Sequence, residues 1–60
     1  MKVIRFQEQE WLLTDGGAIT TEHNYCHGLV SHAHLGEDGV IRRYHKEIGT
    51  AEDIEVLRET

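Results

Sequence analysis

Short runs of apolar and β-branched residues follow one another along the whole chain, separated by turns that contain glycine. Residues 2–7 partly alternate, with Ile4 and Phe6 on one side, as expected for a strand that buries one face. The glycines mark intervals of about eight to twelve residues, which is the spacing of short strands joined by turns. The pattern therefore predicts a mainly β fold whose first strand covers residues 2–7.

A first hairpin is predicted around the sequence Asp15-Gly16-Gly17. This turn lies between the apolar run at 11–14 and a run rich in β-branched residues at 18–21. Glycine adopts positive φ without a steric cost, and β-branched residues favour strands. We therefore expect residues 18–21 to pair back against 11–14.

A second hairpin is predicted from residues 29–35 and 40–48, which flank a Gly-Glu-Asp-Gly turn. If the last three turn residues form a loop with Gly39 in the left-handed region, Leu35 faces Ile41 beside the turn. The same register places two histidines opposite residues of the second strand: His34 opposite Arg42 and His32 opposite Tyr44.

Two segments lack one clear pattern. Residues 22–28 show no period, and we expect a loop or an irregular turn there. Thr50 precedes an acidic stretch, which predicts a helical turn at 50–53 followed by a closing strand at 54–57. A helix over 51–58 fits the apolar spacing of the same tail nearly as well.

These elements describe a single small domain over residues 1–60. The outline resembles a small antiparallel sheet or an SH3-like barrel with one helical turn near residues 50–53, which is an architectural likeness and implies no activity. A domain of this size buries only about 60% of the surface of its unfolded chain, so a disulfide, a metal or self-association often adds stability. Cys26 is the only cysteine, which excludes an intramolecular disulfide.

The charge balance argues against nucleic acid as a partner. Six basic residues stand against eleven acidic ones, for a net charge of −5 with histidine neutral, whereas nucleic-acid binders depend on Lys and Arg to neutralise phosphates. The longest apolar run, Trp11-Leu12-Leu13, is far shorter than the roughly 20 residues of a membrane span. The lone thiol and the absence of a signal peptide predict a reducing, cytoplasmic location with no membrane partner.

Histidine and cysteine residues form the one cluster that suggests metal chemistry. Zinc takes nitrogen and thiolate ligands in a tetrahedral site, so four of these groups would close one and stabilise the domain. The spacing matches no established zinc signature, and ordinary surface or half-buried histidines are the favoured interpretation. The candidate ligands are His23, Cys26, His27, His32 and His34.

An enzymatic function is not expected. Cys26 and His27 are adjacent, and neighbouring side chains on a strand point to opposite faces, so the pair is a poor nucleophile–base arrangement. Sixty residues also leave little room for a water-excluding pocket. No cofactor is predicted, apart from zinc under the metal interpretation.

Composition therefore favours a non-catalytic protein–protein interaction module that self-associates, docks on a larger protein as a small regulator or inhibitor, or does both. Exposed strand edges and a thin core favour such pairing. The alternatives are a small zinc-binding domain and, more weakly, an acidic mimic of nucleic acid. The residue types enriched at interfaces give the candidate contact residues: Trp11, Tyr25, Arg42 and Tyr44.

Overall fold

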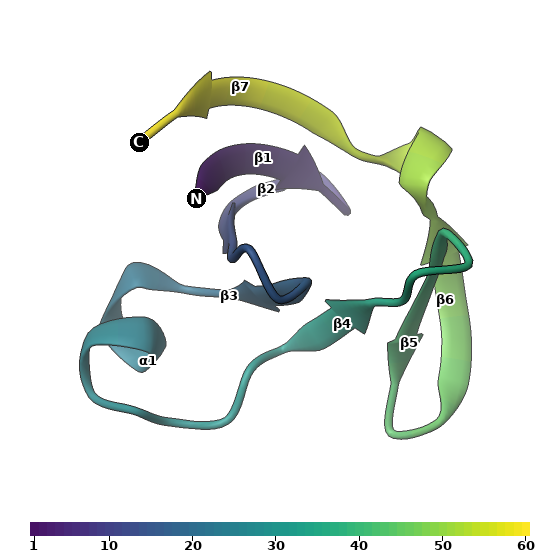
Figure 1. Ribbon diagram of the computed structural model, residues 1–60, viewed down its shortest axis with the longest axis horizontal. Coiled ribbons are helices and arrows are strands. Elements are labelled where there is room, and N and C mark those ends of the chain that lie inside the picture. The colour runs from purple at the N-terminus through teal and green to yellow at the C-terminus, as the bar shows by residue number, and fades with distance from the viewer.

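Seven antiparallel strands form one sheet that curls into a half-barrel in the computed structural model, which describes all 60 residues (Figure 1). The elements in chain order are β1 Lys2–Phe6, β2 Gln9–Leu13, β3 Ala18–Thr20, α1 Glu22–Cys26, β4 Ala33–Leu35, β5 Val40–Arg43, β6 Lys46–Thr50, the 3₁₀ turn η1 Ala51–Asp53, and β7 Glu55–Glu59. The strand order β6-β5-β4-β3-β2-β1-β7 follows the chain except for β7, which returns to β1. The predicted mainly β, antiparallel fold is confirmed.

The hydrophobic core lies on the inner face of the curl. Cross-strand neighbours share one face of a sheet, and Leu13 pairs with Ile19, which in turn pairs with Ala33 on β4. Each of the three central β-branched core residues, Ile4, Ile19 and Ile41, is fully buried. The inner faces of five adjacent strands, β1 to β5, therefore form one continuous core. The complete buried cluster is Ile4, Phe6, Ile19, Ala33 and Ile41.

The first hairpin forms as predicted. Leu13 pairs with Ile19 and Leu12 with Thr20. Gly17 adopts φ +94°, and a Cβ at this position would collide with the carbonyl oxygen of Leu35 on β4. Glycine is therefore required both for the turn and for the close approach of β4.

The second hairpin is confirmed near its turn. Leu35 pairs with Ile41 and His34 with Arg42, and Gly39 lies in the left-handed region with φ +82°. The predicted strand at 29–35 is wrong over its first half, because β4 begins only at Ala33 and the chain runs as coil before it.

The predicted strand at 40–48 is divided by a tight turn. Tyr44 and His45 adopt left-handed φ values of 53° and 68°, and the chain reverses into β6. The pairing of His32 with Tyr44 is therefore not part of the ladder. Two-residue hairpin loops of this geometry usually carry Asn or Gly, and neither residue occurs at 44–45, so this turn could not be predicted. Gln7 and Glu8 form a turn of the same kind between β1 and β2.

Residues 22–26, expected to be a loop, form the short helix α1. The Thr21 hydroxyl accepts a hydrogen bond from the Asn24 amide at 3.1 Å, and Glu22 occupies the first turn, where an acid suits the helix dipole. A capping threonine followed by an acid was thus the signal for this helix, although five residues are too few to show a period.

The tail follows the first of its two predictions. The Thr50 amide donates to the Asp53 carboxylate at 2.8 Å and closes η1. Residues 55–59 then form β7 and pair with β1. The alternative helix over 51–58 is wrong, because the apolar side chains of the tail serve a strand at the edge of the sheet.

Candidate interaction face

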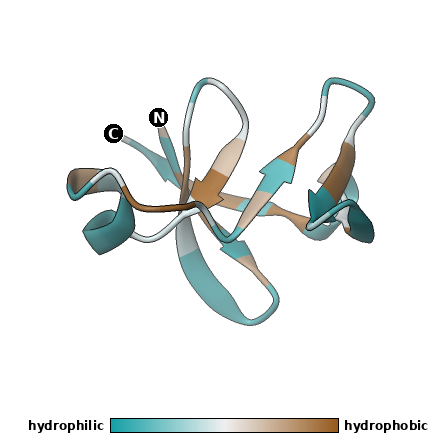
Figure 2. Ribbon diagram, turned by 90° about the horizontal axis from the view of Figure 1, so that it is seen from below, coloured by the Kyte–Doolittle hydropathy of each residue, from teal (hydrophilic) through white to brown (hydrophobic).

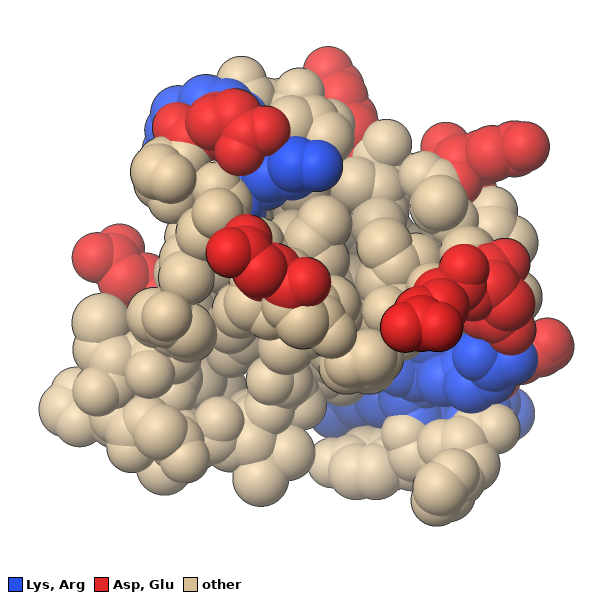
Figure 3. Space-filling view, viewed as in Figure 1, with Lys and Arg blue, Asp and Glu red and all other residues tan.

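A stretch of fourteen residues carries no full charge and lies on one side of the molecule. Residues 23–36, called here the uncharged segment, contain no Asp, Glu, Lys or Arg, so all 6 basic and 11 acidic side chains belong to the rest of the chain. The segment comprises most of α1, the following coil and β4. In Figure 3 its part around α1 is tan, whereas blue basic side chains form a patch at the lower right, where Figure 1 places the β5–β6 hairpin.

Large apolar side chains of this segment are exposed. Val30 has 79% of its surface accessible, and Tyr25 and Leu29 are about half exposed. Figure 2 colours the first part of the coil after α1 brown, which marks it as hydrophobic. Tyr44, in the β5–β6 turn, is the most exposed of all at 80%. Apolar groups gathered at a surface are typical of a site that a partner covers.

A hollow of about 220 Å³ lies between the coil before β4 and the β5–β6 turn. We call it the basic hollow, because its lining contains two arginines and two histidines but no carboxylate. Val30 and Tyr44 both line this hollow, so the two most exposed large apolar side chains of the chain border the same depression. The lining residues are Val30, Ser31, His32, Ala33, His34, Arg42, Arg43 and Tyr44.

The two arginines of the hollow differ in their partners. Arg42 forms an ion pair with Asp38 at 2.9 Å, and this hydrogen-bonded pair lowers the pKa of Asp38 and raises the pKa of Arg42. Arg43 forms no ion pair, and its guanidinium carbon lies 5.2 Å from the centre of the Tyr44 ring. The charge of Arg42 is thus partly compensated, and that of Arg43 is not.

His32 connects the hollow to the core. Its ring stacks on the Trp11 indole with centroids 4.3 Å apart and 18° between the planes, and its Nε2 lies 3.3 Å from Gln7 Oε1. The indole is fixed in turn by a hydrogen bond from Trp11 Nε1 to the Phe6 carbonyl at 2.9 Å. Partial burial lowers the pKa of His32, and the nearby positive charge of Arg43 lowers it further.

The four predicted contact residues divide into three positions. Arg42 and Tyr44 both line the basic hollow. Trp11 is half-buried against the core and reaches the hollow only through His32. Tyr25 lies on α1 beside a different depression that it shares with Leu29. Sequence reasoning did not select Val30 or Arg43, since their exposure and lack of a counter-ion are properties of the fold.

The candidate metal ligands are not assembled into one site. His23 and His27 lie one helical turn apart with ring centroids 4.4 Å apart, while Cys26 is exposed on the same helix. His32 instead packs on Trp11, and His34 pairs across from Arg42. No three His, Cys, Asp or Glu side chains lie in an arrangement that could hold a metal ion. His23, Cys26 and His27 thus lie together at α1, whereas His32 and His34 lie elsewhere, at and before β4.

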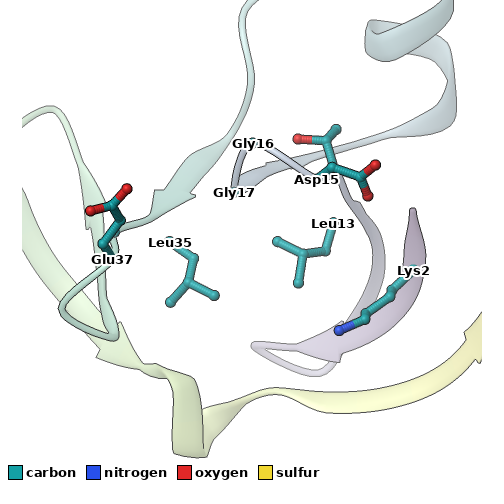
Figure 4. Close-up of a pocket in the computed structure, with 9 residues that line it drawn as sticks. Lys2, Leu13, Asp15, Gly16, Gly17, Leu35 and Glu37 are labelled. Carbon is teal, nitrogen blue, oxygen red and sulfur yellow. The ribbon is translucent and has the colours of Figure 1, made fainter.

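The largest depression, of about 470 Å³, opens at the mouth of the half-barrel (Figure 4). Leu13 and Leu35 point into it, while Lys2, Asp15 and Glu37 stand on its rim with charged ends that point in different directions. Asp15 already pairs with the N-terminal ammonium group at 3.1 Å. These groups do not converge on a common point, which acid–base catalysis would need.

Comparison of this chain with known protein families, curated proteins and solved structures finds no match. Neither helical segment has the length and apolar character that a membrane-crossing helix needs.

Proposed function

We propose that this domain is a non-catalytic protein–protein interaction module that docks on a larger protein through the basic hollow, as a small regulator or inhibitor. The observation that supports this most directly is the position of Val30 and Tyr44. Both are about four-fifths exposed, and both border a depression without a single carboxylate in a strongly acidic chain. A partner that covers the depression would remove both apolar side chains from water.

The residue types at Tyr44 and Arg43 are those enriched at the centres of protein interfaces. Tyrosine and arginine are the residue types most often found to dominate binding energy, and Arg43 lies over the Tyr44 ring. The volume of about 220 Å³ is below the roughly 300–1,000 Å³ of small-molecule sites. Recognition of a protruding side chain of a protein therefore suits the hollow better than recognition of a free metabolite.

Self-association through the same face is the second form of this proposal. Two copies would bury Val30 and Tyr44 against each other, and the exposed edges of β6 and β7 offer further pairing sites. A reducing, cytoplasmic location is part of the proposal, because Cys26 is an exposed thiol without a partner. The acidic-mimic alternative has less support, since the acidic side chains in Figure 3 stand in several separate places.

The test compares serine substitutions on and off the proposed face. Val30→Ser and Tyr44→Ser alter exposed side chains of the hollow, and Val56→Ser is the matched control, because Val56 is a half-exposed side chain on β7. A partner that the wild-type protein captures is first identified and purified. We then expect Val30→Ser and Tyr44→Ser to lose binding to this partner, and Val56→Ser to retain it.

Light scattering coupled to size exclusion tests the second form of the proposal on the same three variants. A dimer that both face variants dissociate supports self-association, and a strict monomer at tens of micromolar excludes it. Equal partner binding by all three variants would show that the basic hollow is not the docking face.

A further inference from the structure

We infer that the basic hollow receives an acidic segment of the partner, whose Glu or Asp carboxylate pairs with Arg43 beside the Tyr44 ring. This inference rests on the proposed function and specifies the chemistry of the partner.

Arg43 lines the basic hollow together with the two exposed apolar side chains. Val30, Arg43 and Tyr44 line the same depression, so a partner that covers the two apolar side chains also covers the guanidinium group. A charge that is taken out of water without a counter-ion is strongly destabilising. The chain supplies no such counter-ion, because Arg43 forms no ion pair and the hollow contains no carboxylate. The partner must therefore bring the anion.

The geometry of the side chain favours a carboxylate as that anion. The planar guanidinium group presents paired N–H donors that match the two oxygens of a carboxylate. Arg42 already uses its donors in this way, with Asp38 at 2.9 and 3.4 Å. Arg43 is the remaining guanidinium group in the hollow, and the two nearby histidines, His32 and His34, are further N–H donors.

Charge elsewhere in the molecule disfavours nucleic acid as the source of the anion. Affinity for a phosphate backbone grows with the number of phosphates that Lys and Arg neutralise. One uncompensated arginine in a hollow of about 220 Å³ neutralises one or two such groups, and the chain as a whole carries a charge of −5. A single carboxylate flanked by apolar side chains fits this surface, whereas a continuous polyanion does not.

The experiment uses the full chain and synthetic peptides of defined charge. The probe is a capped decapeptide with one central glutamate flanked by valines, compared with versions in which glutamine or lysine replaces that glutamate, and with a ten-nucleotide single-stranded DNA. Trp11 is the only tryptophan and stacks on His32, which lines the hollow, so its fluorescence reports binding and isothermal titration calorimetry gives the affinity.

We expect the glutamate peptide to bind at least about tenfold more tightly than the glutamine peptide, and the lysine peptide and the DNA not to bind measurably. Arg43→Gln should remove this preference, and Arg43→Lys should retain part of it. The matched control is Arg58→Gln, because Arg58 is also exposed and free of an ion pair but belongs to β7. Circular dichroism of each variant verifies its fold.

Several results would overturn the inference: equal binding of the glutamate and glutamine peptides, tighter binding of the lysine peptide or the DNA, or an equal loss in Arg43→Gln and Arg58→Gln. Its failure is distinguishable from failure of the proposed function. If the purified partner is lost by Val30→Ser and Tyr44→Ser but is unaffected by Arg43→Gln, the docking face is correct and the acidic partner is not.

Discussion

The strands β1–β3 and the uncharged segment at residues 23–36 differ in the exposure of their large apolar side chains. In β1 the residues Val3, Ile4 and Phe6 are buried, and the only exposed side chains are the cations Lys2 and Arg5. In the uncharged segment the large side chains of Leu29 and Val30 are exposed, with no charged neighbour in the sequence. The first region contributes most of the core, whereas the second contributes Ala33 and Leu35 to it and leaves Leu29 and Val30 exposed. Such surface is free to serve a partner.

The largest expected effect compares one aliphatic residue from each region. Ile19→Ala removes a fully buried side chain from the centre of the sheet and should lower the free energy of unfolding by about 2–5 kcal/mol. Val30→Ala removes a side chain that is 79% exposed and should change it by less than about 0.5 kcal/mol. Urea denaturation followed by circular dichroism measures both. A loss of similar size in Val30→Ala would show that the Val30 side chain is part of the core.

A smaller effect is expected from two glycines that share a left-handed backbone but differ in surroundings. Gly17→Ala and Gly39→Ala each place a Cβ on a residue with positive φ, which costs about 1–2 kcal/mol. At Gly17 the Cβ also collides with the Leu35 carbonyl oxygen, whereas nothing lies within 4 Å at Gly39. Gly17→Ala should therefore lower the melting temperature clearly more than Gly39→Ala. Equal shifts would mean that β4 moves away from the β2–β3 turn at little cost.

The smallest effect concerns His32, through which the uncharged segment contacts Trp11. The pKa of His32 is lowered in the folded protein, first by partial burial and then by the charge of Arg43. The unfolded chain therefore takes up this proton more readily, so stability is full above pH about 6.5 and falls as the pH decreases below it. The groups that share the hollow with His32 are His34, Arg42, Arg43 and Tyr44, and Gln7 and Trp11 pack against it.

Unfolding curves at pH 7.5 and 5.5 for the wild type and for His32→Gln measure the contribution of His32 to the pH dependence of stability. We expect the wild type to lose more stability than the variant between the two pH values. The same loss in both proteins would assign the pH dependence to other groups.

The sequence predicted the sheet where glycine marked the turns. Gly17 and Gly39 located two hairpins and, for the second, the register of Leu35 with Ile41. The turns at Gln7–Glu8 and Tyr44–His45 were not predicted, because none of their four left-handed residues is the Gly, Asn or Asp that marks a two-residue hairpin turn. Strand pairing on both sides fixes these turns, and pairing of this kind is a tertiary property.

The candidate site was predicted only in part. Residue type alone selected Arg42 and Tyr44, which do lie together in the basic hollow. Leu29 and Val30 were assigned to a strand because their hydrophobicity is visible in the sequence, whereas their exposure is not. The importance of Arg43 depends on the absence of a nearby carboxylate, and Arg42 and Arg43 differ in this respect only after folding.

The two chain ends lie side by side, since the Thr60 amide donates to the Met1 carbonyl at 2.9 Å and β7 pairs with β1. Figure 1 places both ends on the opposite side of the molecule from the β5–β6 hairpin. A label, a surface tether or a fusion partner attached at either terminus therefore leaves the basic hollow facing outward. For the same reason, the domain is suited to insertion as a cassette into a loop of a host protein, because the loop would need to open by only the width of two neighbouring strands.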